Sequence, residues 1–336
     1  MKKLAFIDLE FHKKTKSSDF FKDILKEEYH VDIFYEEFPK WDYDVYLYWQ
    51  TKPSYFDLIK LKNKIVVFCP MYDDLPMIKI LWKRFLSVDL KIICFSHKLY
   101  DFFKNLWFNC LYVQYFIPPL DYKVDYGKKK CFFWYRWSIT WDNIKTIIWD
   151  QDVELTIKNK PDPWYKPLEL SKEDIEKYNI TFQNEFFDTK EEYFKHLAKH
   201  SIFIAPRVKE WIWMSFLESM SIWQCVIAYD ESTMNEYIKD GENGLLTGFL
   251  KKINLSNFDK LGKNCKNNYL IKYMEKVTSN TKNILNFITK WNNIKKIRTN
   301  EYILWIILDL LIFIHRKVIY ISEKLKFWKR IFYTKY

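Results

Sequence analysis

The chain has 336 residues, of which 49% are hydrophobic and 29% charged, and its formal net charge is +11. This length favours two domains of ordinary size, and this composition excludes a disordered chain. The positive charge indicates an anionic partner, either anionic lipid or a phosphorylated small substrate; no nucleic acid is expected, because zinc-finger spacing and aromatic RNA-binding strands are missing from the sequence.

The first 120 residues alternate short apolar runs with helix-like stretches, a pattern typical of parallel βαβ units. The expected strands are Lys3–Asp8, Val31–Tyr35, Val45–Trp49, Lys64–Cys69, Lys91–Phe95 and Cys110–Tyr115. The expected helices are Ser18–Glu28, Tyr55–Leu61, Met77–Phe85 and Lys98–Leu106. We therefore predict a Rossmann-like domain over residues 1–120.

Pro118 and Pro119 interrupt this pattern, and the charged segment that follows is typical of a linker. A second alternating series predicts the strands Cys131–Tyr135, Val153–Ile157, Ile180–Asn184, Ile202–Ala205 and Cys225–Tyr229. The helices expected in it are Trp141–Ile148, Glu191–His200, Ser215–Ser221 and Met234–Lys239, and residues 255–291 continue as amphipathic helix. We predict a second Rossmann-like domain with closing helices over residues 121–295.

Residues 296–336 form a separate tail. Tyr302 to Ile314 is almost wholly apolar and is followed by a basic run, but it is too short to span a bilayer, which needs about 20 residues. We expect an amphipathic helix over residues 302–330 that lies on a membrane surface. A helix packed on the back of the protein is the alternative.

The cysteines indicate the compartment. The chain has 6 cysteines without a C-x-x-C pair, mostly inside apolar runs, so we expect reduced, buried thiols in the cytoplasm. Asp8 and Glu10 interrupt the first apolar run too early for a secretion signal. With the tail, this predicts a cytoplasmic protein that is peripheral on the inner face of the membrane.

The most specific pattern lies between Pro206 and Leu246. Glu210 and Glu218 are separated by seven residues, and the segment from Glu236 to Leu246 reads EYIKDGENGLL. Glu-x7-Glu followed by Glu-x-Ile-x-x-Gly-x-x-Gly-Leu-Leu resembles the donor-sugar site of the retaining GT-B glycosyltransferases known as the "group 1" family. The resemblance is strongest over residues 130–250 and reaches the first half only through its architecture. It implies an α/β GT-B fold, in which two Rossmann-like domains face a cleft.

The resemblance also implies roles for the two glutamates. Glu218 should accept hydrogen bonds from the ribose hydroxyls of a nucleotide-sugar, and Glu210 should lie near the transferred sugar as a catalytic residue. Helix N-termini would add backbone amides for the diphosphate. The alternatives are a capping box between Ser215 and Glu218 and a solvated loop position for Glu210.

The residues that would bind the diphosphate through positive charge differ in part from those of the family. The family has an arginine after the first strand of the second domain and a lysine about five residues later. Arg136 fits the first role, but Trp141 stands at the lysine position. Arg207 and Lys158, which follow other strands, are the candidate replacements. Each of the three could instead be an ordinary surface cation.

On the acceptor side, many relatives carry a histidine after the fourth strand, where this chain reads PMYDD. Tyr72 and Asp73 are the candidates for its work, and His97 is expected only to begin a helix. A retaining enzyme of this family needs no general base, because positioning and charge stabilisation carry catalysis. Neither a metal ion nor another cofactor is expected, since the sequence has no histidine cluster.

Tryptophan stands where the family usually carries glycine, most clearly at Trp211 and Trp213, in the donor-binding loop, and at Trp223. Further positions of this kind are Trp107, Trp137, Trp149 and Trp164. The chain has 15 Trp and 5 Gly, against an average glycine share of about 7%. We hypothesise that UGA codons, read as glycine in the source organism, were translated as tryptophan. The alternative is genuine tryptophans on apolar faces, which we favour for Trp49, Trp82, Trp305 and Trp328.

Together these patterns predict a retaining glycosyltransferase that moves a sugar from a nucleotide-sugar to a glycan or lipid-linked acceptor in cell-surface polysaccharide synthesis. The alternative is a non-catalytic GT-B-like protein that binds a nucleotide-sugar or a glycan, for which the missing lysine and the PMYDD loop are the reasons. The donor base, the donor sugar and the acceptor are not encoded in the motif.

Overall fold

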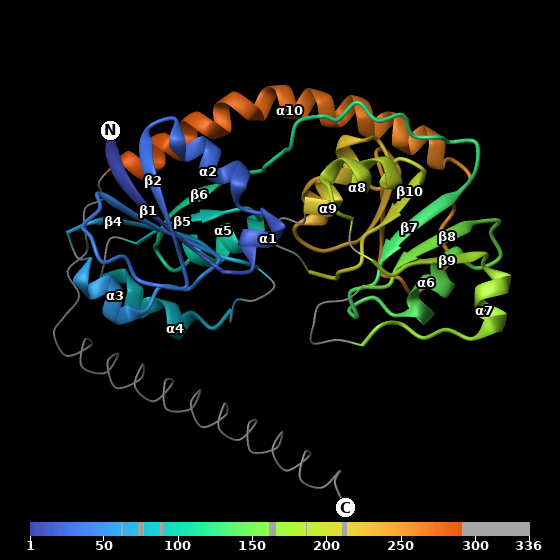
Figure 1. The fold of residues 1–336 in the computed structure, drawn as a ribbon, viewed down its shortest axis with the longest axis horizontal. Coiled ribbons are helices and arrows are strands. Elements are labelled where there is room, and N and C mark those ends of the chain that lie inside the picture. The colour runs from blue at the N-terminus through green and yellow to red at the C-terminus, as the bar shows by residue number, and fades with distance from the viewer. Residues whose placement is uncertain are drawn as a thin grey trace, which may run out of the picture.

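The computed structural model describes residues 1–61, 63–72, 75, 77–87, 90–160, 166–185, 187–209 and 214–290. Each half of the chain builds its own six-stranded sheet, and every described strand pairing within the two sheets is parallel. Figure 1 shows the two units next to each other, with one long helix, α10 (Phe258–Thr289), lying along both. The prediction of two doubly wound α/β units is confirmed.

The first unit has the strand order β2-β1-β3-β4-β5-β6. Its strands are β1 (Lys2–Asp8), β2 (Tyr29–Tyr35), β3 (Val45–Trp49), β4 (Ile65–Cys69), β5 (Leu90–Cys94) and β6 (Asn109–Tyr112). Its helices are α1 (His12–Thr15), α2 (Asp19–Lys26), α3 (Tyr55–Lys60), α4 (Lys79–Lys83), the 3₁₀ turn η1 (Arg84–Ser87) and α5 (His97–Lys104). The expected helix Met77–Phe85 is thus shorter and ends in η1, and α1 was not predicted.

The second unit has the strand order β12-β11-β10-β7-β8-β9. Its strands are β7 (Lys130–Trp134), β8 (Glu154–Lys158), β9 (Ile180–Gln183), β10 (Ile202–Ile204), β11 (Cys225–Tyr229) and β12 (Leu245–Thr247). Its helices are α6 (Trp141–Ile148), α7 (Lys172–Lys177), α8 (Lys190–Leu197), α9 (Met214–Ser221) and the 3₁₀ turn η2 (Met234–Glu236), followed by α10. The predicted helix Met234–Lys239 was wrong beyond this turn, because the Asn243 side chain accepts the backbone N–H of Lys239 at 2.7 Å.

In each sheet the strand order reverses at one point, called the switch point, where the chain begins to add strands on the other side. In the first unit this switch lies between β1 and β3, and in the second it lies between β7 and β10. Open α/β sheets bind ligands beyond the carboxyl ends of the strands at such switch points. The residues that follow β1, β7 and β10 are therefore the places to look for a site.

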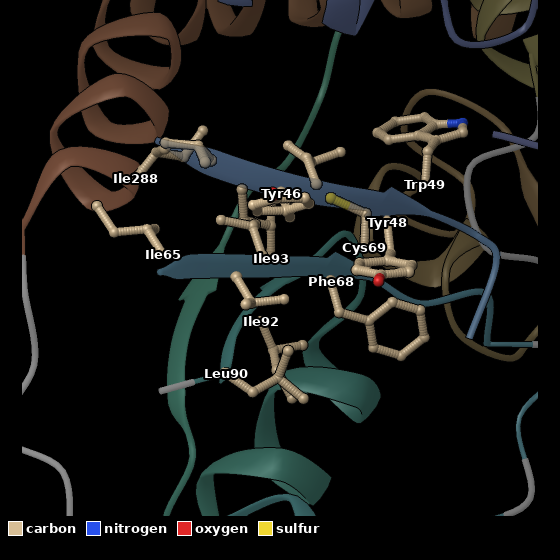
Figure 2. Close-up of a cluster of buried hydrophobic side chains, with 14 of the residues drawn as sticks. Tyr46, Tyr48, Trp49, Ile65, Phe68, Cys69, Leu90, Ile92, Ile93 and Ile288 are labelled. Atoms are coloured by element: carbon tan, nitrogen blue, oxygen red, sulfur yellow. The ribbon is translucent and has the colours of Figure 1, made fainter. Parts of the chain in front are cut away.

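The core of the first unit includes part of the last described helix. Figure 2 shows Ile288 of α10 beside Ile65 of β4, in one apolar cluster with Tyr46 and Ile93. The beginning of α10 instead packs into the second unit through Phe258 and other buried residues. Helix α10 therefore belongs to the cores of both units.

A buried lysine holds the end of α10. Lys91 on β5 is 0% exposed, and its Nζ donates to the backbone carbonyls of Phe287 (2.8 Å), Ile288 (3.1 Å) and Lys290. The last carbonyls of a helix lack partners inside the helix and carry its negative dipole end. The ammonium group satisfies both needs, which accounts for a charge in the middle of an apolar sheet.

We expect Lys91→Met to lower the free energy of unfolding by about 2 kcal/mol, because buried carbonyl oxygens lose a charged donor. Urea unfolding measures the change. Lys104→Met, at an exposed position in the last turn of α5, is the control and should stay within about 0.5 kcal/mol of the parent. Equal stability of the parent and the Lys91 variant would contradict the stabilising role.

The two units meet through polar contacts at the loops that follow β5 and β11. The Glu236 carboxylate accepts the backbone N–H of His97, which begins α5 as predicted, at 2.8 Å, and the hydroxyl of Tyr112 at 2.7 Å. Lys98 pairs with Glu231 at 2.8 Å. Burial raises the pKa of Glu236. The carboxyl edges of the two sheets therefore face each other.

The backbone supports the glycine hypothesis at three of its positions. Trp107, Trp137 and Trp223 have φ angles of 69°, 63° and 74°, in the left-handed region that favours glycine. Trp107 and Trp137 are 79% and 48% exposed, so apolar packing does not explain them. Trp149, by contrast, has a φ of −48°, and the left-handed residue at that helix end is Asp150.

The remaining tryptophan positions of the hypothesis and of its alternative fall into two groups. Trp49 and Trp82 are 0% exposed inside the first core, as expected of genuine tryptophans. Positions 164, 211, 213, 305 and 328 lie outside the described residues, as does the tail, residues 296–336 with its segment 302–330.

Within the described ranges, no helix has the length and apolar character needed to cross a membrane. Five of the cysteines are buried and Cys110 is half-buried.

Candidate active site

Two cations meet at the indole of Trp134, the last residue of β7. The Arg136 guanidinium carbon lies 4.2 Å from the ring centroid, and Nζ of Lys158, the last residue of β8, lies 3.8 Å from it. The indole N–H donates to the Lys160 carbonyl at 3.1 Å, which fixes the ring. Because β7 and β8 are parallel neighbours, both cations lie at the carboxyl edge of the sheet, beside the switch point.

Lys158 is nearly buried, with 3% exposure. Burial and, to a smaller extent, the charge of Arg136 lower the pKa of this lysine to about 8, although the charge of Glu218 acts in the opposite direction. Two like charges held together on one ring repel each other, and a bound anion would relieve that repulsion. The pair can therefore donate charge-assisted hydrogen bonds to an oxyanion such as a diphosphate.

Glu218 lies on α9 with 8% exposure. Burial raises the pKa of its carboxyl group to about 7, although Lys190, Tyr193 and Lys158 act in the opposite direction. The Tyr193 hydroxyl is buried beside it but makes no hydrogen bond of good geometry with the described residues. The buried Tyr193 hydroxyl thus lacks a hydrogen bond of good geometry beside the Glu218 carboxyl group, and a hydroxyl of a bound ligand would supply one.

The capping alternative for Glu218 does not hold. The residue before a helix has non-helical backbone when it caps the helix with its side chain. Here α9 already includes Met214, so Ser215 is a helical residue and its hydroxyl cannot cap the N-terminus. The hydroxyl of Ser219 instead bonds back to the Ser215 carbonyl at 2.7 Å.

The remaining predicted site residues fall into two groups. Glu210, Trp211, Trp213 and Asp73 lie outside the described residues, so their predicted roles stay predictions. Arg207 follows β10 at the same carboxyl edge as Arg136. Tyr72 follows β4 in the other unit and is 5% exposed, with Nζ of Lys98 5.2 Å from its ring centroid. Since Lys98 also pairs with Glu231, Tyr72 lies near the boundary between the units.

The sequence reasoning missed Trp134 and Tyr193. A tryptophan at the end of an apolar strand is ordinary core material in a sequence, and only its neighbours in space make it a platform for two cations. Tyr193 lies within the predicted helix Glu191–His200, where no spacing relates it to Glu218. Among the described residues, no group of three or more His, Cys, Asp or Glu side chains could hold a metal ion.

The second unit matches a known protein family. Residues 138–252 match the family described as "Glycosyl transferases group 1". The match runs from just after Arg136 to beyond β12 and includes Lys158 and Glu218, so the resemblance seen in the Glu-x7-Glu pattern is confirmed. A sequence comparison with curated proteins found no significant match.

Several solved structures share this fold. A sucrose-phosphate synthase from Thermosynechococcus elongatus aligns with a TM-score of 0.62 at 12% identity, over 86% of this chain and 100% of its own. HepE from Anabaena, solved with UDP and glucose, gives 0.57 at 11% identity over 86% and 100%. A glycosyltransferase from Rickettsia africae gives 0.54 at 10% identity over 84% and 99%. The GT-B fold is thereby confirmed, and family and fold together support a glycosyltransferase.

Proposed function

We propose that the protein is a retaining glycosyltransferase that moves a sugar from a nucleotide-sugar to a glycan or lipid-linked acceptor in cell-surface polysaccharide synthesis. The observation that carries the proposal is the cluster of Arg136, Lys158 and Glu218 at the carboxyl edge of the second sheet. The cluster combines two cations, which can bind a diphosphate, with a carboxylate, which can bind a diol. The nucleotide of a nucleotide-sugar carries both groups, since its diphosphate is attached to a ribose with two free hydroxyls.

In this proposal the diphosphate lies against Arg136 and Lys158, with Arg207 as a further donor, and Glu218 accepts hydrogen bonds from the ribose hydroxyls. Glu210 contacts the transferred sugar, and positions 211 and 213 line the approach of the donor. Tyr72 and Asp73 contribute on the acceptor side. The cations stabilise the charge that develops on the leaving diphosphate, so the proposed transfer uses no metal ion and no other cofactor.

The proposal extends to organisation and location. Residues 1–120 would bind the acceptor, residues 121–295 would bind the donor, and residues 296–336 would hold the protein on the inner face of the cytoplasmic membrane through an amphipathic helix over 302–330. Vesicle sedimentation with and without anionic lipid tests the last point on the full chain, since a charge-driven anchor requires the anionic lipid.

Sugar release from a panel of UDP-sugars and GDP-sugars tests the function. We expect release from at least one donor, and we expect Arg136→Met and Lys158→Met each to reduce it by about 10- to 100-fold, the effect of losing a hydrogen bond to a charged group. Lys145→Met, which removes a half-buried cation of α6 that pairs with Asp142 at 3.0 Å and with Asp174 at 3.7 Å, is the matched control. Full activity of both site variants would contradict the diphosphate assignment.

Proton uptake gives a second test of Lys158. A diphosphate beside Lys158 favours the charged form and raises its pKa from about 8, so binding should draw protons from the buffer near pH 8. Titration calorimetry with UDP in two buffers of different ionisation enthalpy measures this uptake. We expect up to about half a proton per site in the parent and none in Lys158→Met. Identical binding enthalpies in the two buffers would place the diphosphate elsewhere.

A non-catalytic binding protein is the second candidate. The observation that favours it is Trp141 at the family's lysine position, where the indole is 7% exposed and donates to Asp174 at 2.8 Å, so it serves the core of the second unit. That candidate predicts tight binding of a nucleotide-sugar without any release of sugar, and the donor panel therefore separates the two.

A further inference from the structure

One loop of the second unit makes several hydrogen bonds to the first unit. This loop, residues 230–237, follows β11 and includes the turn η2. Its Glu236 carboxylate accepts the backbone N–H of His97 at 2.8 Å and the hydroxyl of Tyr112 at 2.7 Å. The backbone carbonyl of Glu236 accepts Nε2 of Gln114, also at 2.7 Å. Glu236 therefore binds the first unit through both its side chain and its backbone.

The Glu236 carboxylate also completes the N-terminus of a helix in the other unit. The first amides of an α-helix have no partner inside the helix and lie at its positive dipole end. At α5 the N-cap residue Ser96 accepts the N–H of Leu99, and Glu236 accepts the N–H of His97. Figure 1 shows α5 on the side of the first unit next to the second unit. Separation of the two units would remove this acceptor from the helix.

Glu231, near the start of the same loop, lies between cations of both units. It pairs with Lys98 of α5 at 2.8 Å. Burial acts to raise the pKa of Glu231, but hydrogen bonds from Lys98 and from the Ser232 backbone, together with the charges of Lys98 and Lys209, lower it. Lys209 directly precedes Glu210 in the sequence. Glu231 therefore connects the first unit to the segment that leads to the predicted donor-sugar residue.

Lys98 extends these contacts to the acceptor side. Its Nζ lies 5.2 Å from the ring centroid of Tyr72, the candidate acceptor residue that follows β4. The contacts therefore run from Tyr72 through Lys98 to Glu231. Tyr72 and Glu210 belong to different units, so their separation depends on how the two units are held together.

We propose that Glu236 is a positioning residue, which holds the two units in the arrangement in which the sugar is transferred. In this proposal Glu236 touches neither substrate and acts through His97 and Tyr112. Transfer needs reacting atoms about 3–3.5 Å apart, and a displacement of about 1 Å can cost about 100-fold in rate. Glu231 and Lys98 make a second, partly exposed contact with the same effect. The inference rests on the proposed function and gives a role to a motif residue that had none.

The test compares Glu236→Ala with Glu242→Ala, which removes an exposed glutamate from its 3.5 Å pair with Lys239 in the same segment. UDP binding by calorimetry reports whether each variant keeps a folded donor site. Transfer from UDP-sugars and GDP-sugars to a panel of nitrophenyl glycosides, and to water, gives kcat and KM. We expect Glu236→Ala to lose about 10- to 100-fold in kcat, with the donor KM and the UDP affinity unchanged. Glu236→Gln should recover part of kcat, because its amide can accept from His97 and donate to Tyr112. Glu242→Ala should match the parent.

A second measurement does not depend on turnover. Small-angle X-ray scattering of the full chain gives the radius of gyration, which should be larger in Glu236→Ala than in the parent and in Glu242→Ala. Tyr112→Phe removes a donor from the opposite unit and should shift the radius and kcat in the same directions. Combined with Glu236→Ala, it should add nothing, because the two side chains share one interaction.

Two results would overturn the inference: a Glu236→Ala variant with the radius of gyration of the parent, or one with its kcat. If Glu236→Ala does not fold, Tyr112→Phe decides by the same two readouts. A parent that binds no UDP and releases no sugar from any donor would instead contradict the proposed function. The scattering comparison distinguishes the two failures, because it needs no substrate.

Discussion

Glycine at positions 107, 137 and 223 together should raise the free energy of unfolding by about 3 kcal/mol or more. Each of these residues has a positive φ, and a side chain other than glycine in that region costs roughly 1–2 kcal/mol. Urea unfolding of the parent and of the triple variant Trp107→Gly, Trp137→Gly, Trp223→Gly measures the difference. The expected sign is unusual, because replacing large residues by glycine ordinarily destabilises a protein.

Two exposed tryptophans serve as controls. Trp149→Gly changes a residue with a φ of −48°, and Trp41→Gly changes one that is 77% exposed and lies outside the positive-φ set. Neither should gain stability. UGG codons at 107, 137 and 223 would end the decoding hypothesis directly, whereas UGA codons would extend it to positions 211 and 213. With glycine at 211, 213 and 223 we expect stronger donor binding, and equal affinity in both versions would refute this.

Glu218→Gln should stabilise the free protein above neutral pH while it weakens donor binding. The folded carboxyl group has a pKa of about 7, above its ordinary value of 4.5. Its contribution to stability is therefore complete below pH 4.5 and is lost as the pH rises through 7, because the buried group must then ionise. Glutamine avoids this loss, so the variant should exceed the parent by about 3 kcal/mol at pH 8 and show no such advantage near pH 4.5.

Urea unfolding at several pH values measures the stability change, and calorimetry with UDP measures the binding change, for which we expect about a 10- to 100-fold loss. Glu191→Gln, on the exposed face of the neighbouring helix α8, is the control. Glu191→Gln should leave the UDP affinity unchanged. Its free energy of unfolding should follow that of the parent at every pH. A Glu218→Gln variant that binds UDP as the parent does would remove the ribose role.

The regular elements could be predicted because their signal is local. β3, α6 and β11 were predicted with their observed bounds, since each is a clear apolar or amphipathic run. Short elements such as α1, α7 and β12 lack enough residues to show a period, and neighbours decide their conformation. The predicted site residues also had a local signal. Arg136 and Lys158 were found because they follow strands, and Glu218 was found because it belongs to a family motif.

Contacts between distant residues were the part that the sequence could not supply. The sequence identified Glu236 only as part of a family motif, but its carboxylate accepts hydrogen bonds from His97 and Tyr112 of the other unit. The pairing of Asp8 with His12 and Ser18 depends on how a loop folds over the end of β1. The Glu236 contacts join segments far apart in the sequence, and no spacing rule predicts them.

The shared helix α10 also constrains how the chain can fold during synthesis. Ile284, Leu285 and Ile288 complete the core of the first unit, although the ribosome makes them after the whole second sheet. At about 5–20 residues per second, the first unit must therefore wait roughly 10 s or more with an apolar face uncovered. A fragment that stops at residue 120 keeps this face exposed, so we expect it to aggregate or to recruit chaperones, whereas a fragment of residues 1–120 supplied with a separate 258–290 peptide should recover solubility.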